Sequence, residues 1–300
     1  MQFFYCSERL SLRLCLSLFV VLLLSAQSNN ALALEYTDAA GRNIELSAPP
    51  RRIVSLVPSV TEILYALHAE HQLVGVTDFC NYPPAASQKR SVGAYDSPGL
   101  ETVISLAPDL IIMDIAGSSP GLLRQFEQLG VPVFLVAPKS LDSTMGTIDA
   151  LGMLTGKEVQ AQVLLNMLRD RIEQVRKMRP AKTVRTLVCV MIKPLIVAAG
   201  GTLADDLIGL AGGSNVVAGL RRYPVIGMEM VLAYDPELII VSPHPGTPNP
   251  VDYFQKWPQL QAVRNHNVVN IKADLLQRPG PRLVDGLREL ANQYEQMESR

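Results

Sequence analysis

The chain has 300 residues, of which 48% are hydrophobic and 18% charged, and its 27 Lys and Arg residues stand against 28 Asp and Glu residues, for a formal net charge of −1. This composition supplies enough apolar material for the cores of one or two globular domains and excludes a chain that is disordered as a whole. It provides no basic field for a phosphate backbone, so nucleic-acid binding is not expected.

The first 33 residues have the layout of a cleavable secretory signal. Two arginines precede an uncharged apolar run, residues 14–24, and a polar stretch then leads to Ala31-Leu32-Ala33, with small residues at 31 and 33. The apolar run is shorter than the roughly 20 residues that a membrane-spanning helix needs. We therefore expect export and cleavage after Ala33, with a cut near Ala26 as the alternative, and we set residues 1–33 apart from the fold.

Downstream of this segment, strand-like apolar runs alternate with helix-like amphipathic segments. The runs that read as strands are residues 53–57, 73–77, 110–113, 131–136, 187–191, 238–241 and 268–271. The amphipathic segments between them include residues 60–67, 121–129 and 204–211. This alternation predicts α/β layers built on mostly parallel sheets.

One predicted helix is much longer than the others. Residues 157–178 contain no glycine or proline, carry apolar residues at helical spacing, and end before Pro180. A helix of this length can cross a whole domain, because each residue adds about 1.5 Å. We therefore expect an N-terminal α/β lobe over residues 34–156, an inter-lobe helix over residues 157–179, and a C-terminal α/β lobe over residues 180–300.

A sequence repeat on either side of this helix supports two similar lobes. The segment Glu101-Thr-Val-Ile-Ser-Leu-Ala-Pro108-Asp-Leu-Ile-Ile112 matches Glu229-Met-Val-Leu-Ala-Tyr-Asp-Pro236-Glu-Leu-Ile-Ile240 at a constant offset of 128 residues. Each copy reads as a short helix that opens with a carboxylate and stops before proline, followed by a buried strand. A loop tyrosine precedes each glutamate by six residues, Tyr95 in one copy and Tyr223 in the other, and such loops usually face the ligand crevice of open α/β sheets.

Further motifs resemble a known family. They are Arg52-Ile-Val-Ser-Leu-Val-Pro58-Ser59-Val-Thr-Glu62, Asn81-Tyr82-Pro83-Pro84, the two Glu/Pro segments above, Leu210-Ala-Gly-Gly-Ser-Asn215 and Arg278-Pro-Gly-Pro-Arg282. In these motifs and their order, from about Arg51 to Leu290, the chain resembles the periplasmic substrate-binding proteins of ABC importers for cobalamin, haem and iron-siderophores. The cobalamin-binding proteins are the subgroup that it resembles most.

The resemblance implies a fold and a function. It implies two α/β lobes joined by a single long backbone helix, with a ligand crevice between the lobes. It implies a periplasmic monomer that holds cobalamin or another corrinoid as transported ligand and passes it to an ABC permease dimer with its ATPase subunits. No cofactor, metal site or catalytic residue is expected, and haem or an iron-siderophore is the alternative ligand.

The resemblance also implies ligand contacts by aromatic side chains. In the cobalamin-binding relatives, aromatic residues at the places of Tyr82, Tyr95 and Tyr223 contact the ligand, and rigid aromatic faces suit a flat macrocycle. The alternative is that all three are ordinary half-buried loop tyrosines. A further aromatic residue of that subgroup falls near Ile196, where this chain departs from the pattern.

One glutamate in each lobe is expected to dock the protein on its permease. The resemblance places Glu101 and Glu229 on the outer surface, where they pair with arginines of the two permease subunits. The alternative is that each is only a favourable carboxylate in the first turn of a helix.

Other residues of the expected ligand site each have a structural alternative. Ser59 and Glu62 read as a capping box behind Pro58 at a helix start; if that helix start borders the crevice, its free N–H groups meet polar ligand edges. Arg278 either holds a carboxylate or phosphate of the ligand or ties its loop to the other lobe. His244, between two prolines, is either an axial ligand to a metal centre in the ligand or part of a rigid surface turn.

One motif is typical of a different class, the exported serine hydrolases. Gly117-Ser-Ser119-Pro-Gly121 matches the pattern of hydrolase nucleophile elbows. In those enzymes the residue after the serine donates its backbone N–H to the oxyanion, and Pro120 has no N–H. A hydrolase that uses Ser119 is therefore a remote alternative, and Pro120 is better read as a helix start.

The remaining histidines and cysteines allow two further interpretations. His68 and His71 are three residues apart near a helix end, and without a third ligand close by they favour exposed histidines over the metal pair of a metallochaperone. Cys80 and Cys189 remain after removal of the signal segment. The sequence leaves open whether they form a disulfide or stay separate buried thiols.

Overall fold

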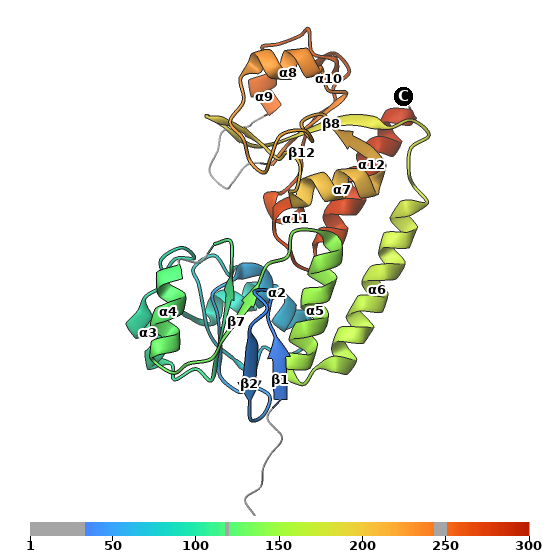
Figure 1. The fold of residues 1–300 in the computed structure, drawn as a ribbon. Helices are drawn as coiled ribbons and strands as arrows, with labels where there is room; N and C mark the ends of the chain where they lie inside the picture. Colours follow the sequence, from blue (N-terminus) through green and yellow to red (C-terminus); the bar gives the residue numbers. More distant parts are fainter. Residues whose placement is uncertain (1–33, 118–119, 243–250, 300) are drawn as a thin grey trace, which may run out of the picture. The chain divides into compact units, whose positions relative to one another are not determined.

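The computed structural model describes residues 34–117, 120–242 and 251–299 (Figure 1). The predicted signal segment lies outside the described residues. The described residues fall into two units, of which the smaller comprises Leu34–Glu35 and Glu45–Ala48. It holds parts of two paired strands, β1 (Leu34–Thr37) and β2 (Asn43–Leu46). Nothing among the described helices is both long and apolar enough to cross a membrane.

The first sheet of the larger unit has five parallel strands in the order β5-β4-β3-β6-β7. In chain order they are β3 (Ile53–Ser55), β4 (Leu73–Val76), β5 (Arg90–Ser91), β6 (Leu110–Asp114) and β7 (Val133–Val136). The helices of this lobe are α2 (Pro58–Ala66), the 3₁₀ helix η1 (Pro84–Gln88), α3 (Leu100–Ser105) and α4 (Pro120–Gln128). Its central strands β3 and β6 are buried except at Asp114, the last residue of β6, as expected for a parallel sheet covered on both faces.

The second sheet has the order β10-β8-β11-β12, all parallel, and β9 pairs antiparallel with β8. In chain order the strands are β8 (Val184–Ile192), β9 (Leu195–Val197), β10 (Gly213–Asn215), β11 (Leu238–Val241) and β12 (Val268–Asn270). The helices are α7 (Leu203–Ala211), α8 (Met228–Tyr234), α9 (Val251–Phe254), α10 (Gln261–Arg264), α11 (Ala273–Gln277) and α12 (Leu283–Glu298). A separate apolar core underlies each sheet.

The long helix that connects the two lobes packs against the helix that precedes it in the chain. The helices α5 (Leu141–Thr155) and α6 (Glu158–Arg176) run side by side (Figure 1). Gly156 ends α5 in the left-handed conformation, with φ of 68°. The helices approach closely at Gly152, where an added Cβ would lie 2.4 Å from the Cβ of Ala161. The chain can therefore reverse within a few residues and hold the long helix against its neighbour.

The sequence repeat gives the same local structure twice. Helices α3 and α8 carry Glu101 and Glu229 in their first turns. The residue before each proline has a positive φ, 43° at Ala107 and 40° at Asp235. Proline disfavours the right-handed helical conformation in the residue that precedes it. Each helix therefore ends at the repeat proline, and a buried strand follows.

An arginine holds each of these two helices to its sheet in the same way. Arg52 donates from Nη2 to the carbonyl of Leu106 at 2.6 Å, and Arg185 donates from Nη2 to the carbonyl of Tyr234. The two carbonyls are 234 − 106 = 128 residues apart, the offset of the repeat. In each lobe the acid after the proline accepts the backbone N–H of the same arginine, at 2.9 Å for Arg52 and 2.8 Å for Arg185. The two lobes therefore share an anchoring scheme as well as a sequence pattern.

The predicted α/β class, with two lobes and one long connecting helix, is confirmed. Each strand-like run and each amphipathic segment named above coincides with a strand or helix, and the long helix is α6. Helix α5 and the short strands β5, β9 and β10 were not predicted. Cys80 and Cys189 are both buried and unpaired, which matches the interpretation as separate thiols.

Candidate functional site

A cavity of about 470 Å³ lies at the carboxyl ends of the central strands of the first sheet. The strand order reverses between β3 and β6, and open α/β sheets bind ligands at such switch points. Two groups of described residues line the cavity, one that follows the strands of the first lobe and one from α11 and the loop after it: Val57, Pro58, Ser59, Phe79, Tyr95, Asp96 and Asp114, with Ala273, Asp274, Gln277, Arg278 and Pro279. The volume lies within the range of roughly 300–1,000 Å³ typical of small-molecule sites.

Helix α2 borders this cavity with its first turn, but it is not capped as predicted. It begins at Pro58, and no side chain makes a capping hydrogen bond at its N-terminus. The predicted capping box of Ser59 and Glu62 is therefore wrong. The Glu62 carboxylate binds Arg278 and Arg282 instead, because hydrogen bonds between ionised partners are stronger than one to a neutral backbone N–H.

Glu62 is the centre of an ion network that joins α2 to the segment from α11 to α12. Arg278 donates from Nη1 to Glu62 at 2.9 Å, and Arg282 donates to both carboxylate oxygens at 2.9 and 2.6 Å. Asp274 pairs with the same two arginines at 3.0 and 3.3 Å. The side chain of Glu62 is 3% exposed, so water screens these pairs little. Arg278 thus ties its loop to the other lobe, and it also lines the cavity.

The ring of Tyr82 covers one of these arginines. The Cζ atom of Arg282 lies 3.8 Å from the ring centroid, within the range of a cation–π contact. Burial lowers the pKa of Arg282, but the hydrogen bonds and charges of Glu62 and Asp274 outweigh burial, and the pKa lies above its ordinary value. Tyr82 is not among the described residues that line the cavity. One face of its ring therefore contacts Arg282, and Tyr82 keeps 42% of its surface exposed.

Tyr95 lines the cavity and has a defined hydrogen bond. Its hydroxyl donates to Oδ2 of Asp114 at 3.2 Å, and the other oxygen of Asp114 accepts the backbone N–H of Ala116 at 2.8 Å. Burial raises the pKa of Tyr95, and the charge of Asp114 raises it further. The phenol therefore stays protonated near neutral pH and presents a neutral, half-buried aromatic face to the cavity.

Tyr223 and Ile196 lie together on the second lobe. Ile196 in β9 pairs with Val225, and the N–H of Val197 donates to the carbonyl of Pro224 at 3.2 Å. Tyr223 is 46% exposed, and neither it nor Ile196 belongs to the described lining of the cavity. The structure therefore places Tyr95 in the cavity wall, and it places Tyr82 and Tyr223 outside the described part of that wall.

Four lining residues of the first lobe are not among the predicted ligand contacts: Val57, Phe79, Asp96 and Asp114. Phe79 follows β4 and keeps 57% of its surface exposed. Asp114 ends β6. The position just after a strand of a parallel sheet was the available signal, because ligand sites form at those ends.

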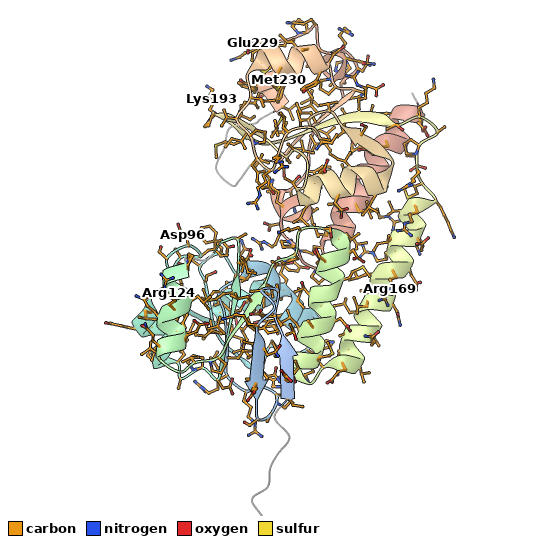
Figure 2. The ribbon with its side chains drawn as sticks, viewed as in Figure 1. Asp96, Arg124, Arg169, Lys193, Glu229 and Met230 are labelled. Atoms are coloured by element: carbon orange, nitrogen blue, oxygen red, sulfur yellow. The ribbon has the colours of Figure 1, made fainter. Side chains whose placement is uncertain are left out.

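The two predicted docking residues are both exposed, Glu101 on α3 and Glu229 on α8. Figure 2 shows the side chain of Glu229 beside that of Met230. Since each glutamate is in the first turn of a helix with the same arginine anchor, the two lobes present their carboxylates in equivalent local settings.

Other predicted residues lie away from the cavity or beyond the described chain. His68 and His71 are exposed, and His68 follows α2 with φ of 56°. Within the described ranges, no group of three or more His, Cys, Asp and Glu side chains could hold a metal ion. His244 and Ser119 are outside the described residues. Pro120 opens α4, as predicted.

Two α/β lobes joined by a long helix, with a cavity lined from both lobes, define a bilobal ligand-binding protein. The chain belongs to the periplasmic binding protein family, which it matches over residues 53–275.

Its relatives include proteins with known ligands. The Vitamin B12-binding protein of Vibrio cholerae is 31% identical over 245 residues, which are 81% of this chain and 88% of that protein. The crystal structure of the periplasmic vitamin B12 binding protein BtuF of Vibrio cholerae superposes with a TM-score of 0.76 at 29% identity, covering 84% of this chain and 99% of that one. The periplasmic heme-binding protein RhuT from Roseiflexus sp. gives a TM-score of 0.73 at 28% identity, covering 82% and 98%.

Proposed function

We propose that this protein is the periplasmic ligand-binding component of an ABC importer, which captures cobalamin or a related corrinoid and delivers it unchanged to the membrane permease. The cavity at the switch point of the first sheet is the observation that carries the proposal. It combines apolar walls and an aromatic face with a few polar groups, as small-molecule sites do. The vitamin B12-binding relatives support the corrinoid as the ligand.

Haem or an iron-siderophore is the second candidate ligand, because heme-binding proteins share this fold at similar identity. Calorimetric titration of the purified protein with cyanocobalamin, haem and a ferric hydroxamate separates the candidates. We expect saturable 1:1 binding of cyanocobalamin that is at least tenfold tighter than that of the other two. Preferred binding of haem or the hydroxamate would replace the corrinoid as the transported ligand.

Glu101 and Glu229 are proposed to dock the two lobes on arginines of the two permease subunits. A two-lobed protein on a two-fold partner needs one acidic group per lobe, and charge complementarity mainly speeds association and sets orientation. The double variant Glu101→Ala/Glu229→Ala should lose transport and keep its affinity for cyanocobalamin. The matched control replaces two other exposed glutamates, Glu158 and Glu295, by alanine and should transport normally. Normal transport by the first variant would disprove docking through these residues.

We also propose that the protein is exported with a cleaved signal and works as a monomer. Residues 1–33 are taken as the cleaved signal, and residues 34–156, 157–179 and 180–300 as lobe, inter-lobe helix and lobe. The mature protein is proposed to be a monomer that works with the permease dimer and its ATPase subunits. Mass spectrometry of protein from the periplasm should give a chain that begins at Leu34, and light scattering should give the mass of one chain. A periplasmic chain that still begins at residue 1 would contradict the cleaved signal, and a mass of two chains would contradict the monomer.

A further inference from the structure

The described lining residues of the cavity include more acidic than basic side chains, and this difference affects which ligand the cavity can bind. Of the described residues that line the cavity, four are charged: Asp96, Asp114, Asp274 and Arg278. Arg278 is the cation among them, and a lone arginine in a ligand cavity would ordinarily bind a carboxylate or phosphate.

In this cavity the guanidinium of Arg278 already binds other side chains of the protein. Its Nη1 donates to the carboxylate of Glu62 at 2.9 Å and to the side-chain carbonyl of Asn81 at 3.0 Å. Its Nη2 lies 3.0 Å from Oδ1 of Asp274. Its side chain is 15% exposed and that of Glu62 is 3% exposed. The positive charge that faces the cavity is therefore balanced by two carboxylates within hydrogen-bonding distance.

The neighbouring arginine cannot take over this role. The guanidinium of Arg282 is paired with the same two acids, Glu62 and Asp274, and the ring of Tyr82 covers its flat face. The two arginines and two acids cancel in charge, so the network contributes no net positive charge to the cavity. Asp96 and Asp114 then leave the described wall with an excess of negative charge.

We infer that Glu62 is a specificity-determining residue, which neutralises Arg278 and so makes the cavity select a ligand with an uncharged, amide-bearing edge over one that carries carboxylates. This inference rests on the corrinoid function proposed above and adds the feature of the ligand that is recognised. Amide N–H groups can donate to Asp96 and Asp114, whereas a ligand carboxylate would face like charge in a partly buried site. Glu62 lies behind Arg278 and is not itself one of the lining residues, so it acts as a positioning residue through Arg278.

The test compares cyanocobalamin with its monocarboxylic derivatives, in which one peripheral amide is hydrolysed to an acid. The pair differs in one group and in one charge, so their affinity ratio isolates the charge preference of the site. We expect the wild-type protein to bind the acids about tenfold more weakly than cyanocobalamin. In Glu62→Gln, which keeps the size of the side chain and removes its charge, Arg278 gains net positive charge, and the ratio should move toward one or reverse.

A second variant and a control keep the test independent of folding. Asp274→Asn removes the other acid on Arg278 from a side chain that is 37% exposed, and it should shift the ratio in the same direction. Asp170→Asn, at an exposed site on α6, should leave the ratio unchanged. A gain in relative affinity for the acids cannot arise from partial unfolding, because unfolding would weaken both ligands alike.

The outcomes distinguish a failure of the proposed role of Glu62 from a failure of the proposed corrinoid function. Tight binding of cyanocobalamin with equal affinity for its acids, or an unchanged ratio in both variants, would overturn the role of Glu62 and leave the corrinoid function standing. Failure to bind cyanocobalamin together with tight binding of haem, which carries two propionates, would overturn both.

Discussion

The ion network around Glu62 makes a direct prediction about stability. In Glu62→Ala the carboxylate that accepts three hydrogen bonds from Arg278 and Arg282 is removed, and two guanidinium groups with side chains only 15% and 17% exposed lose their main partner. Removing one member of a buried ion pair costs about 3–5 kcal/mol. Asp274 still pairs with both arginines and is 37% exposed, so we expect a loss near the lower end, about 3 kcal/mol.

The matched control is an ion pair of the same residue types on the surface. Glu173 and Arg176 on α6 form a pair whose side chains are 57% and 49% exposed. Exposed pairs contribute about 0–1 kcal/mol, because water screens them. Glu173→Ala should therefore change the free energy of unfolding by less than about 0.5 kcal/mol.

Urea unfolding, followed by circular dichroism, measures both variants. We expect a clearly lower midpoint for Glu62→Ala and a midpoint for Glu173→Ala close to that of the wild type, with similar slopes. If the loss in Glu62→Ala is no larger than that in Glu173→Ala, the network does not stabilise the contact between α2 and the α11–α12 segment by about 3 kcal/mol.

Three further predictions concern packing, pH and ligand contact. Gly152→Ala should lower the melting temperature, because the added Cβ would lie 2.4 Å from the Cβ of Ala161 at the α5–α6 contact and cost about 1–3 kcal/mol of stability. Gly146→Ala in the same helix is the control, since its Cβ would meet nothing within 4 Å and should not destabilise the protein. Equal melting temperatures of the two variants would refute the close approach. Burial raises the pKa of Tyr294 to about 12, so the neutral phenol stabilises the folded state fully below the ordinary pKa of 10, and this contribution is lost as the pH rises from 10 to 12. The free energy of unfolding should therefore decline less over that interval in Tyr294→Phe than in the wild type. Parallel pH profiles of the two proteins would contradict a raised pKa of Tyr294. Phe79→Ala should weaken cyanocobalamin binding by about tenfold without changing the melting temperature, and an unchanged affinity would remove Phe79 from the site.

The layers of this fold were predictable from local patterns, and so was the internal repeat. Apolar runs such as residues 238–241 are buried on both faces, so their sequence alone marks them as strands of a parallel sheet. The helices of the repeat were predictable because Pro108 and Pro236 stop them in the same way. Helix α5 was not predicted, since Gly146 and Gly152 interrupt its sequence and its N-terminus depends on two serines, Ser140 and Ser143, that cap each other.

The site was less predictable, because its contacts join residues far apart in the chain. The pattern Ser-x-x-Glu at residues 59–62 is typical of a capping box, but the acid has two arginine partners that are 216 and 220 residues away. Local spacing carries no information on such partners. In the same way, the contact between the Tyr82 ring and Arg282 of the other lobe could not be predicted from local spacing.

A crystal structure of the protein with cyanocobalamin would show in one measurement where the ligand binds and which group Arg278 contacts. We predict that the corrin ring occupies the cavity bounded by Pro58, Tyr95 and Gln277, with peripheral amides toward Asp96 and Asp114 and with Arg278 still paired to Glu62. A corrin ring bound elsewhere with this cavity empty, or a complex in which Arg278 has left Glu62 to bind the ligand, would contradict it.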